Sequence, residues 1–238
     1  MQKLSIAYQT GVTPGKWIDR FVERYPAVDL KVWREDEGQI LDLLATGEAD
    51  AVFVRYRGES PKDATRHVIP LYEELEVVCA GKDHDVEYFE ESVPLETVES
   101  FPQLDLADYP LSTGGIPVAM EVVASGAQVL RTQQSIARLF ARKDVVVRFI
   151  EDGSPTQVGI AWPSAAEDTT LLEEFIGIVR GRTASSSRQT SVRNQEQKAK
   201  RINEQKKAKA KAQAKAKQQA KSSSKKPQGA KAKPRKHR

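Results

Sequence analysis

The charge of this 238-residue chain changes abruptly near residue 182, and this change constrains its fold more than any other feature of the sequence. Residues 1–182 hold 18 Lys and Arg against 31 Asp and Glu, a net charge of −13. Residues 183–238 hold 19 Lys and Arg against 2 Asp and Glu, a net charge of +17. An asymmetry of this size is typical of an acidic folded body joined to a basic interaction tail.

The basic part contains almost no large apolar residue, so we predict a disordered, Lys/Ala-rich tail over residues 183–238. Such a segment cannot bury enough apolar surface to offset an ordering entropy of ~1–2 kcal/mol per residue. Its cations could neutralise nucleic-acid phosphates without sequence preference, lie against the acidic body, or belong to a solvated tether. The residues that would contact a nucleic acid are Lys206, Lys207, Lys209, Lys211, Lys215 and Lys217.

Strand and helix patterns alternate through the acidic part. Apolar spacing predicts strands over residues 4–8, 28–33, 50–54, 75–80, 127–130, 145–150 and 158–162. One helix is predicted to start at Pro14, and four others are predicted over residues 39–45, 117–124, 133–142 and 167–179. A turn is predicted around Pro70. Alternation of this kind indicates an α/β fold with mainly parallel sheets.

Several classes of protein are disfavoured by the composition. The only cysteine, Cys79, lies in an apolar run and is interpreted as a small buried hydrophobe, so no disulfide framework is expected. No apolar run approaches the length of a membrane helix and no signal peptide is evident, which predicts a cytoplasmic protein without a membrane partner. We find no phosphate-binding loop, nucleophile elbow or metal-ligand spacing, and therefore expect no enzyme, cofactor or metal.

Five segments, taken in order, resemble the substrate-binding domains of LysR-type regulators. Phe21–Leu30 resembles the F…YP.V.L segment of that family, Leu43–Ala51 resembles L..G..D.A, and Pro70–Glu74 resembles PL..E. Val122–Ala127 resembles a V..G.G element, and Val158–Trp162 resembles the closing strand. The resemblance covers about residues 3–182. Within the family, the chain is most similar to proteins that consist of a stand-alone substrate-binding domain.

The resemblance implies a two-lobed domain of the type 2 periplasmic-binding-protein fold, residues 1–182, with an effector bound between the lobes. Lobe I would comprise residues 3–79 and 160–182, and lobe II residues 80–159, with crossing strands near residues 77–80 and 158–162. The family's N-terminal winged helix-turn-helix is expected to be absent, since the chain starts at the first strand. Edge-to-edge dimers are common in the family, so the resemblance also suggests a homodimer.

The loop after the first predicted strand is the first candidate binding segment. Ligands of α/β sheets bind at the carboxyl ends of strands, beside helix N-termini, and this rule points to Thr10, Gly11, Thr13 and Lys16. Free amides and the helix dipole favour an anion there, and the threonine hydroxyls would complete a carboxylate cradle. The plainer interpretation is that Thr13 only caps the helix and that Lys16 is solvated.

Arg55 and Tyr56 are the second candidate pair, because they follow the buried strand 50–54 at its carboxyl end. Ser112 and Thr113 would face them from the second lobe. The plainer interpretation of Arg55 and Tyr56 is a charged surface loop.

Two functional hypotheses follow from these features. The first is a non-enzymatic domain that senses a small carboxylate effector and has an accessory role in transcription regulation. The alternative is a nucleic-acid-associated protein that acts through its basic tail and has a degenerate ligand site. An enzyme on the same fold is the weakest of the interpretations.

Overall fold

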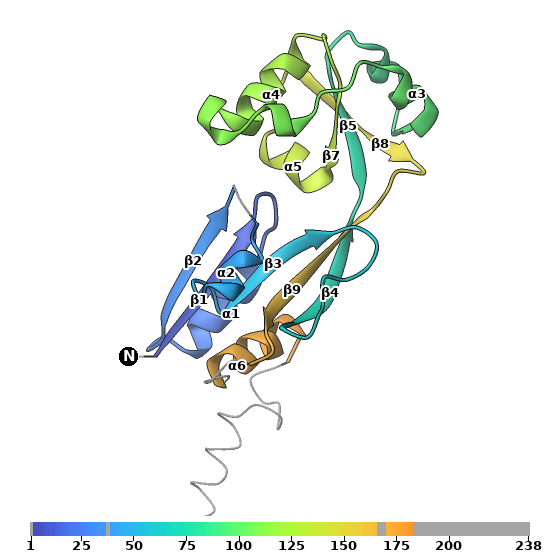
Figure 1. The fold of residues 1–238 in the computed structure, drawn as a ribbon. Helices are drawn as coiled ribbons and strands as arrows, with labels where there is room; N and C mark the ends of the chain where they lie inside the picture. The colour runs from blue at the N-terminus through green and yellow to red at the C-terminus, as the bar shows by residue number, and fades with distance from the viewer. Residues whose placement is uncertain (1, 37–38, 166–169, 183–238) are drawn as a thin grey trace, which may run out of the picture. The chain divides into compact units, whose positions relative to one another are not determined.

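The computed structural model describes residues 2–36, 39–165 and 170–182, which belong to one compact unit, Met1–Arg182. The predicted disordered tail and its six candidate lysines lie outside the described residues. The described chain forms two lobes, each built on its own β-sheet (Figure 1). The two-lobed α/β fold predicted from the sequence is confirmed.

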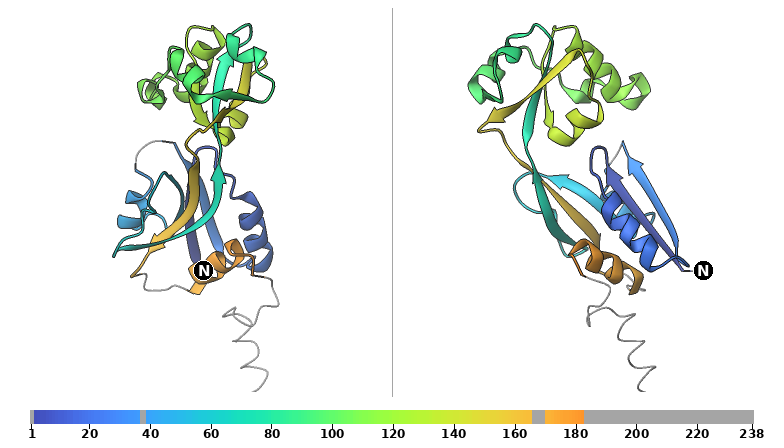
Figure 2. Two further views of the ribbon diagram at one scale, coloured as in Figure 1. Left: turned by 90° about the vertical axis from the view of Figure 1, so that its right-hand side faces the viewer. Right: turned by 180° about the vertical axis from the view of Figure 1, so that it is seen from behind.

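Lobe I is built on a five-stranded sheet with the order β2-β1-β3-β9-β4. Its strands are β1 (Lys3–Gln9), β2 (Asp29–Glu35), β3 (Ala51–Tyr56), β4 (Arg66–Glu74) and β9 (Thr156–Pro163). Helices α1 (Gly15–Arg24) and α6 (Thr170–Val179) cover one face, and the short helix α2 (Asp42–Ala45) covers the other (Figure 2).

An aromatic cluster fills the core under α1 and α6. Phe21, Phe53 and Phe175 are fully buried there. Trp17 stacks on Phe53 with ring centroids 5.4 Å apart, and Phe175 meets Phe21 edge-on at 5.5 Å. Each buried aromatic side chain removes a large apolar area from water, so this cluster anchors α1, and with it the loop that precedes α1, on the sheet.

Lobe II is built on a four-stranded sheet with the order β6-β8-β5-β7. Its strands are β5 (Glu76–Gly81), β6 (Ser92–Pro94), β7 (Leu130–Gln133) and β8 (Val145–Glu151). Helices α3 (Leu95–Ser100), α4 (Gly115–Ala124) and α5 (Gln134–Leu139) pack around it, together with three short 3-10 helices. These are Asp85–Tyr88, Leu106–Asp108 and Leu111–Thr113.

The chain passes between the two sheets twice. β4 ends at Glu74 and β5 begins at Glu76, so Leu75 forms the first crossing, and residues 152–155 form the second. Both crossings come before the boundaries at residues 79 and 160 that the sequence suggested. The apolar runs used for that prediction lie inside buried strands, whereas the crossing residue Leu75 is 54% exposed.

The prediction of mainly parallel sheets is wrong, because both sheets are mixed. β1 pairs parallel with β2 and β3, and β6 pairs parallel with β8. β9 runs antiparallel to β3 and β4, and β5 runs antiparallel to β7 and β8. Parallel pairs need a crossover such as α1, whereas β9 returns directly from lobe II and therefore runs against its neighbours.

The turn predicted around Pro70 is also wrong, since Pro70 lies within β4. β4 is at the edge of its sheet, where a proline without an N–H group is tolerated. The pairing of β4 with β9 shifts register between Pro70 and Tyr72. The other differences are small: the helix at 39–45 begins only at Asp42, and the strand at 127–130 lies at Leu130–Gln133.

The buried thiol of Cys79 provides a test of how tightly lobe II is packed. Cys79 is fully buried on β5, and burial raises the pKa of its thiol to about 12. At pH 8 only ~10⁻⁴ of such a thiol is ionised. We predict that iodoacetamide does not modify native Cys79 within an hour at pH 8 but labels the urea-unfolded chain completely, as measured by mass spectrometry. Rapid labelling of the native protein would contradict the packing described for this strand.

Candidate functional site

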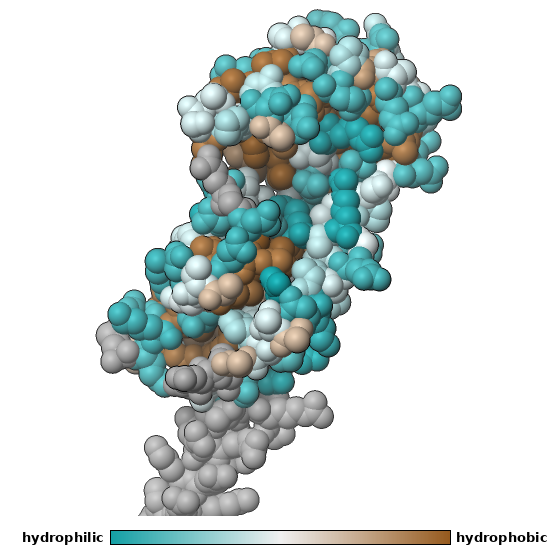
Figure 3. All heavy atoms as spheres, in the orientation of Figure 1, coloured by the Kyte–Doolittle hydropathy of each residue, from teal (hydrophilic) through white to brown (hydrophobic). Residues whose placement is uncertain are grey.

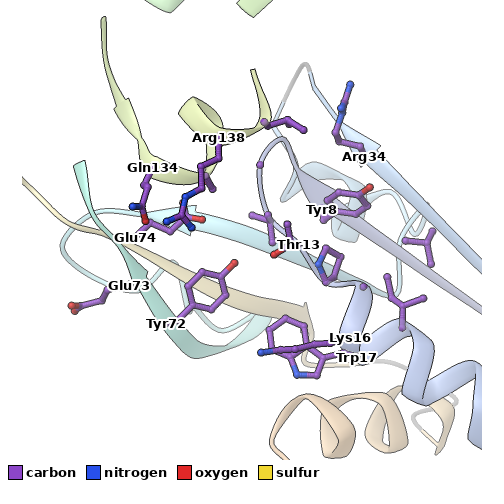
Figure 4. Close-up of a pocket in the computed structure, with 18 residues that line it drawn as sticks. Tyr8, Thr13, Lys16, Trp17, Arg34, Tyr72, Glu73, Glu74, Gln134 and Arg138 are labelled. Carbon is purple, nitrogen blue, oxygen red and sulfur yellow. The ribbon is translucent and has the colours of Figure 1, made fainter. Parts of the chain in front are cut away.

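Two grooves lie between the lobes, and the larger has a volume of about 1030 Å³. One wall consists of the β1–α1 loop and the start of α1, and the others come from β4 and from α5 of lobe II. Figure 4 shows the Tyr72 hydroxyl directed into the space between these elements, with Thr13 on one side of it and Arg138 above it. In the space-filling view the lobes are joined along the side of β4 and β5 (Figure 3).

The smaller groove has a volume of about 410 Å³ and a more polar lining. Thr10, Arg55 and Tyr56 line it from lobe I, and Gln133 lines it from lobe II. The amide of Gln133 donates to the hydroxyl of Thr156, 3.5 Å away, at the start of β9.

A close contact between the lobes separates the two grooves. Gly11 lies in the β1–α1 loop with a φ of +85°, a left-handed conformation that favours glycine. A Cβ atom at this position would lie 2.8 Å from Nη2 of Arg55 and 2.9 Å from Oγ of Ser135. Gly11 is therefore the residue that allows the loop of lobe I to approach helix α5 of lobe II.

Arg55 is the centre of this contact. Its Nε donates to Oε2 of Glu74 at 2.6 Å, and the side chains of the pair are only 10% and 6% exposed. Its Nη1 donates to the carbonyl oxygen of Thr10 at 2.5 Å, and its Nη2 donates to the hydroxyl of Ser135 at 2.9 Å. The guanidinium thus links the end of β1, the end of β4 and the start of α5.

A second ion-pair network lies on the other side of Leu75. Glu76 is buried, and its carboxylate accepts from Arg57 at 3.3 Å and from Arg131 of lobe II at 3.2 Å. The backbone amide of Ser154, in the second crossing, also donates to Glu76 at 2.9 Å. Both crossings are therefore held by glutamates that are surrounded by arginine or amide donors.

The N-terminus of α1 faces the larger groove. Pro14 occupies the cap position and no side chain caps the helix, so the interpretation of Thr13 as a helix cap is wrong. The Thr13 side chain is exposed and lines the groove. The first amides of an α-helix lack intrahelical partners, and they lie beside this hydroxyl.

Tyr72 is a groove residue that the sequence analysis missed. Its side chain is partly buried and lines the groove beside Thr13. Burial first, and then the nearby Glu74 carboxylate, raise the pKa of Tyr72 above its usual value. The phenol therefore keeps its proton at neutral pH and can donate it to an acceptor in the groove.

The positive charges that line the larger groove differ in their pairing. Arg34 is paired with Asp36 at 2.6 Å. Asp36 loses some hydration, but its hydrogen bonds from Arg34 and Thr10 outweigh this loss and lower its pKa. Lys16 lies over the ring of Trp17, 4.5 Å from its centroid, and within the described part of the chain neither Lys16 nor Arg138 forms an ion pair.

The predicted site residues lie in three places: the larger groove, the smaller groove and the 3-10 helix before α4. Gly11, Thr13 and Lys16 line the larger groove. Thr10, Arg55 and Tyr56 line the smaller one.

Ser112 and Thr113 line neither groove. They are exposed in the 3-10 helix before α4, where the Thr113 hydroxyl donates to the carbonyl oxygen of Pro110. These two hydroxyls are therefore not brought together with Arg55 and Tyr56.

Residues 2–36, 39–165 and 170–182 contain neither a candidate metal site nor a candidate membrane span. No cluster of three or more His, Cys, Asp or Glu side chains in these ranges could bind a metal ion. None of the helices in the same ranges combines the length and the apolar character that are needed to span a bilayer.

Residues 12–113 match the family model described as the LysR substrate binding domain. The solved structures that match include the reduced form of the OxyR regulatory domain from Pseudomonas aeruginosa, with a TM-score of 0.59 and 22% identity over 75% of this chain and 97% of that one. They also include the BenM effector binding domain with its effector benzoate, with a TM-score of 0.61 and 14% identity over 75% of this chain and 90% of that one. Full-length CbnR complexed with its target DNA matches with a TM-score of 0.58 and 14% identity over 75% of this chain and 70% of that one. No curated protein matches the chain.

Removing one partner of the buried pair Arg55–Glu74 should destabilise the fold strongly. We predict that Glu74→Gln lowers the free energy of unfolding by about 3 kcal/mol, because the Arg55 charge then stays buried without a counter-ion. Urea unfolding followed by circular dichroism measures this change. The neighbouring exposed Glu73 is the matched control, and Glu73→Gln should change stability by less than about 0.5 kcal/mol. Equal effects of the two substitutions would contradict the role of the pair.

Proposed function

We propose that this chain, whose residues 12–113 match the LysR substrate binding domain model, binds a small carboxylate effector in the larger groove between its lobes. The family consists of ligand-binding domains of transcription regulators, so the proposed role is non-enzymatic and regulatory. The observation that carries the proposal is a groove with largely apolar walls that is also lined by the unpaired cations Lys16 and Arg138 and by the exposed hydroxyl of Thr13.

The donors come from both lobes. Lys16, the Thr13 hydroxyl and the N-terminus of α1 belong to lobe I, and Arg138 belongs to lobe II. Charge-assisted hydrogen bonds of this kind bind carboxylates more strongly than neutral ones do. The benzoate bound by the BenM effector binding domain is a carboxylate, and this supports the same ligand class for the present chain.

Binding between two lobes can be coupled to a regulatory output through the two crossings. A ligand that contacts both lobes has a higher affinity for the closed arrangement, and it shifts the population towards that arrangement. Arg55 then has a role in joining the lobes, because each of its three guanidinium nitrogens donates to Thr10, Glu74 or Ser135.

A thermal-shift screen of small carboxylates followed by calorimetry tests this function. A carboxylate that binds the native state raises the melting temperature. Lys16→Gln should weaken the binding of such a ligand about 10-fold, since it removes one charged donor. Arg20→Gln is the matched control, because Arg20 is an exposed cation on the same helix and does not line the groove. Equal affinities of the two variants would place the ligand elsewhere.

Polyanion binding through residues 183–238 remains a prediction, supported by their net charge of +17. Full-length protein should bind duplex DNA or RNA with an affinity that falls steeply between 50 and 200 mM salt, roughly 10³-fold if about six phosphates are neutralised. A chain that ends at Thr183 should lose this binding in an anisotropy titration. Retention of binding by the shorter chain would show that the tail is not the binding segment.

A further inference from the structure

We propose that Arg138 and Leu139 form the ligand-binding surface of lobe II, and that the ligand is a monocarboxylate with an apolar body. This inference rests on the proposed function and adds to it the chemical class of the effector. The guanidinium of Arg138 would form an ion pair with the carboxylate of the ligand, and Leu139 and Tyr72 would contact its apolar body.

The first step of the argument is the position of Arg138. It lies on α5, is exposed, and lines the larger groove together with Gln134 and Ser135. Figure 4 shows its side chain extending from α5 into the groove, towards the strand that carries Tyr72. The opposite side of the same helix is buried, because Ile136 and Ala137 are 8% and 2% exposed. The packing of α5 therefore fixes which side chains face the groove.

The second step is the charge balance of the groove. Its other arginine, Arg34, is neutralised by Asp36 at 2.6 Å, and the buried Glu74 is neutralised by Arg55 at 2.6 Å. Glu73 is exposed and also lines the groove, and no ion pair of Glu73 is found among the described residues. Among the described residues this leaves Lys16 and Arg138 as the unpaired cations of the lining, one on each lobe. With the one negative charge of Glu73 against the two positive charges of Lys16 and Arg138, the unpaired charge of the lining is net positive, so an anion is favoured over a cation.

The third step concerns the apolar part of the lining. Leu139 is 49% exposed, although leucine is usually buried, and it is adjacent in sequence to Arg138 and lines the same groove. Ile18 and Val32 line the groove from lobe I, and Tyr72 adds a partly buried ring. A guanidinium beside exposed apolar surface is complementary to a molecule with one carboxylate and a hydrocarbon body. Because Glu73 offsets one of the two unpaired cations, a second carboxylate on the ligand would exceed the net positive charge of the lining and would be disfavoured.

The fourth step concerns the link to the crossings. The backbone amide of Gln134 donates to the carbonyl oxygen of Leu75 at 3.0 Å, and the hydroxyl of Ser135 accepts from Arg55 at 2.9 Å. Helix α5 is therefore attached at its start to the first crossing and to lobe I. A ligand held by Arg138 from lobe II and by Lys16 from lobe I bridges the lobes next to this attachment.

Calorimetry with matched probe pairs tests the assignment. Benzoate and hexanoate should bind the full-length protein at least 10-fold more tightly than benzamide and hexanamide, and also more tightly than acetate or succinate. Arg138→Gln should remove most of the preference for carboxylate over amide. Leu139→Asn should weaken hexanoate and benzoate at least 3-fold while the carboxylate preference is kept. Arg142→Gln is the control, because Arg142 is a nearby cation that pairs with Asp144 at 2.9 Å and lies outside the groove.

The outcomes separate the two proposals. If Arg138→Gln binds the carboxylates like wild type while Lys16→Gln loses them, the groove is the ligand site and the assignment of Arg138 is wrong. If Arg138→Gln weakens acid and amide by the same factor, Arg138 does not read the carboxylate and the assignment is also wrong. If succinate binds more tightly than hexanoate, the ligand class is wrong. If no carboxylate binds the wild-type protein, the proposed function fails and this inference fails with it.

Discussion

The buried ion pair between Arg55 and Glu74 determines how the two lobes are held, and the rest of the site is arranged around it. Removing two charges from water is costly, and the cost is recovered only when both groups are fully hydrogen-bonded. Here the guanidinium donates to Glu74, to the Thr10 carbonyl and to Ser135, so its charge is neutralised while it joins three elements. A substitution that removed one partner would leave the other buried and uncompensated.

The spacing of charges along the chain explains why the crossings have two such networks. Arg55 and Arg57 are two residues apart, as are Glu74 and Glu76, and alternate residues of an extended chain project to the same side. Leu75 lies between the two glutamates at the first crossing and is exposed. Glu74 is thereby directed to Arg55, and Glu76 is directed to Arg57 and Arg131. The same geometry divides the space between the lobes into a larger groove and a smaller polar groove.

The sequence predicted the helices and strands that have a strong apolar pattern. It did not predict the features that depend on tertiary contacts, such as the position of β4 and the direction of β9. The strands at β1, β3 and β8 and the helix at α4 were found because buried side chains recur along them at regular spacing. β4 was missed because a proline within a strand indicates a turn unless the strand is known to lie at a sheet edge. The direction of β9 was missed because antiparallel return from a second lobe leaves no local signal.

The same limit applied to the candidate site. The segment from Thr10 to Lys16 was found because a helix start after a strand is recognisable in the sequence, and the structure places Gly11, Thr13 and Lys16 on one groove. Arg55 was predicted to bind the ligand, whereas its side chain donates to Thr10, Glu74 and Ser135 and joins the lobes. Arg138 and Tyr72 were missed because only the folded chain brings α5 and β4 to the same groove.

These contacts divide the residues between the lobes into those that hold the lobes together and those of the larger groove whose side chains are exposed. Gly11, Arg55 and Glu74 are buried or constrained, and substitutions there would disturb the fold before they changed recognition. Lys16, Arg138 and Leu139 are exposed, so their side chains contribute little to stability. A fold whose lobes are joined by buried residues can change its ligand through exposed ones, and the specificity of this chain should therefore be decided on the groove-facing side chains of α1 and α5.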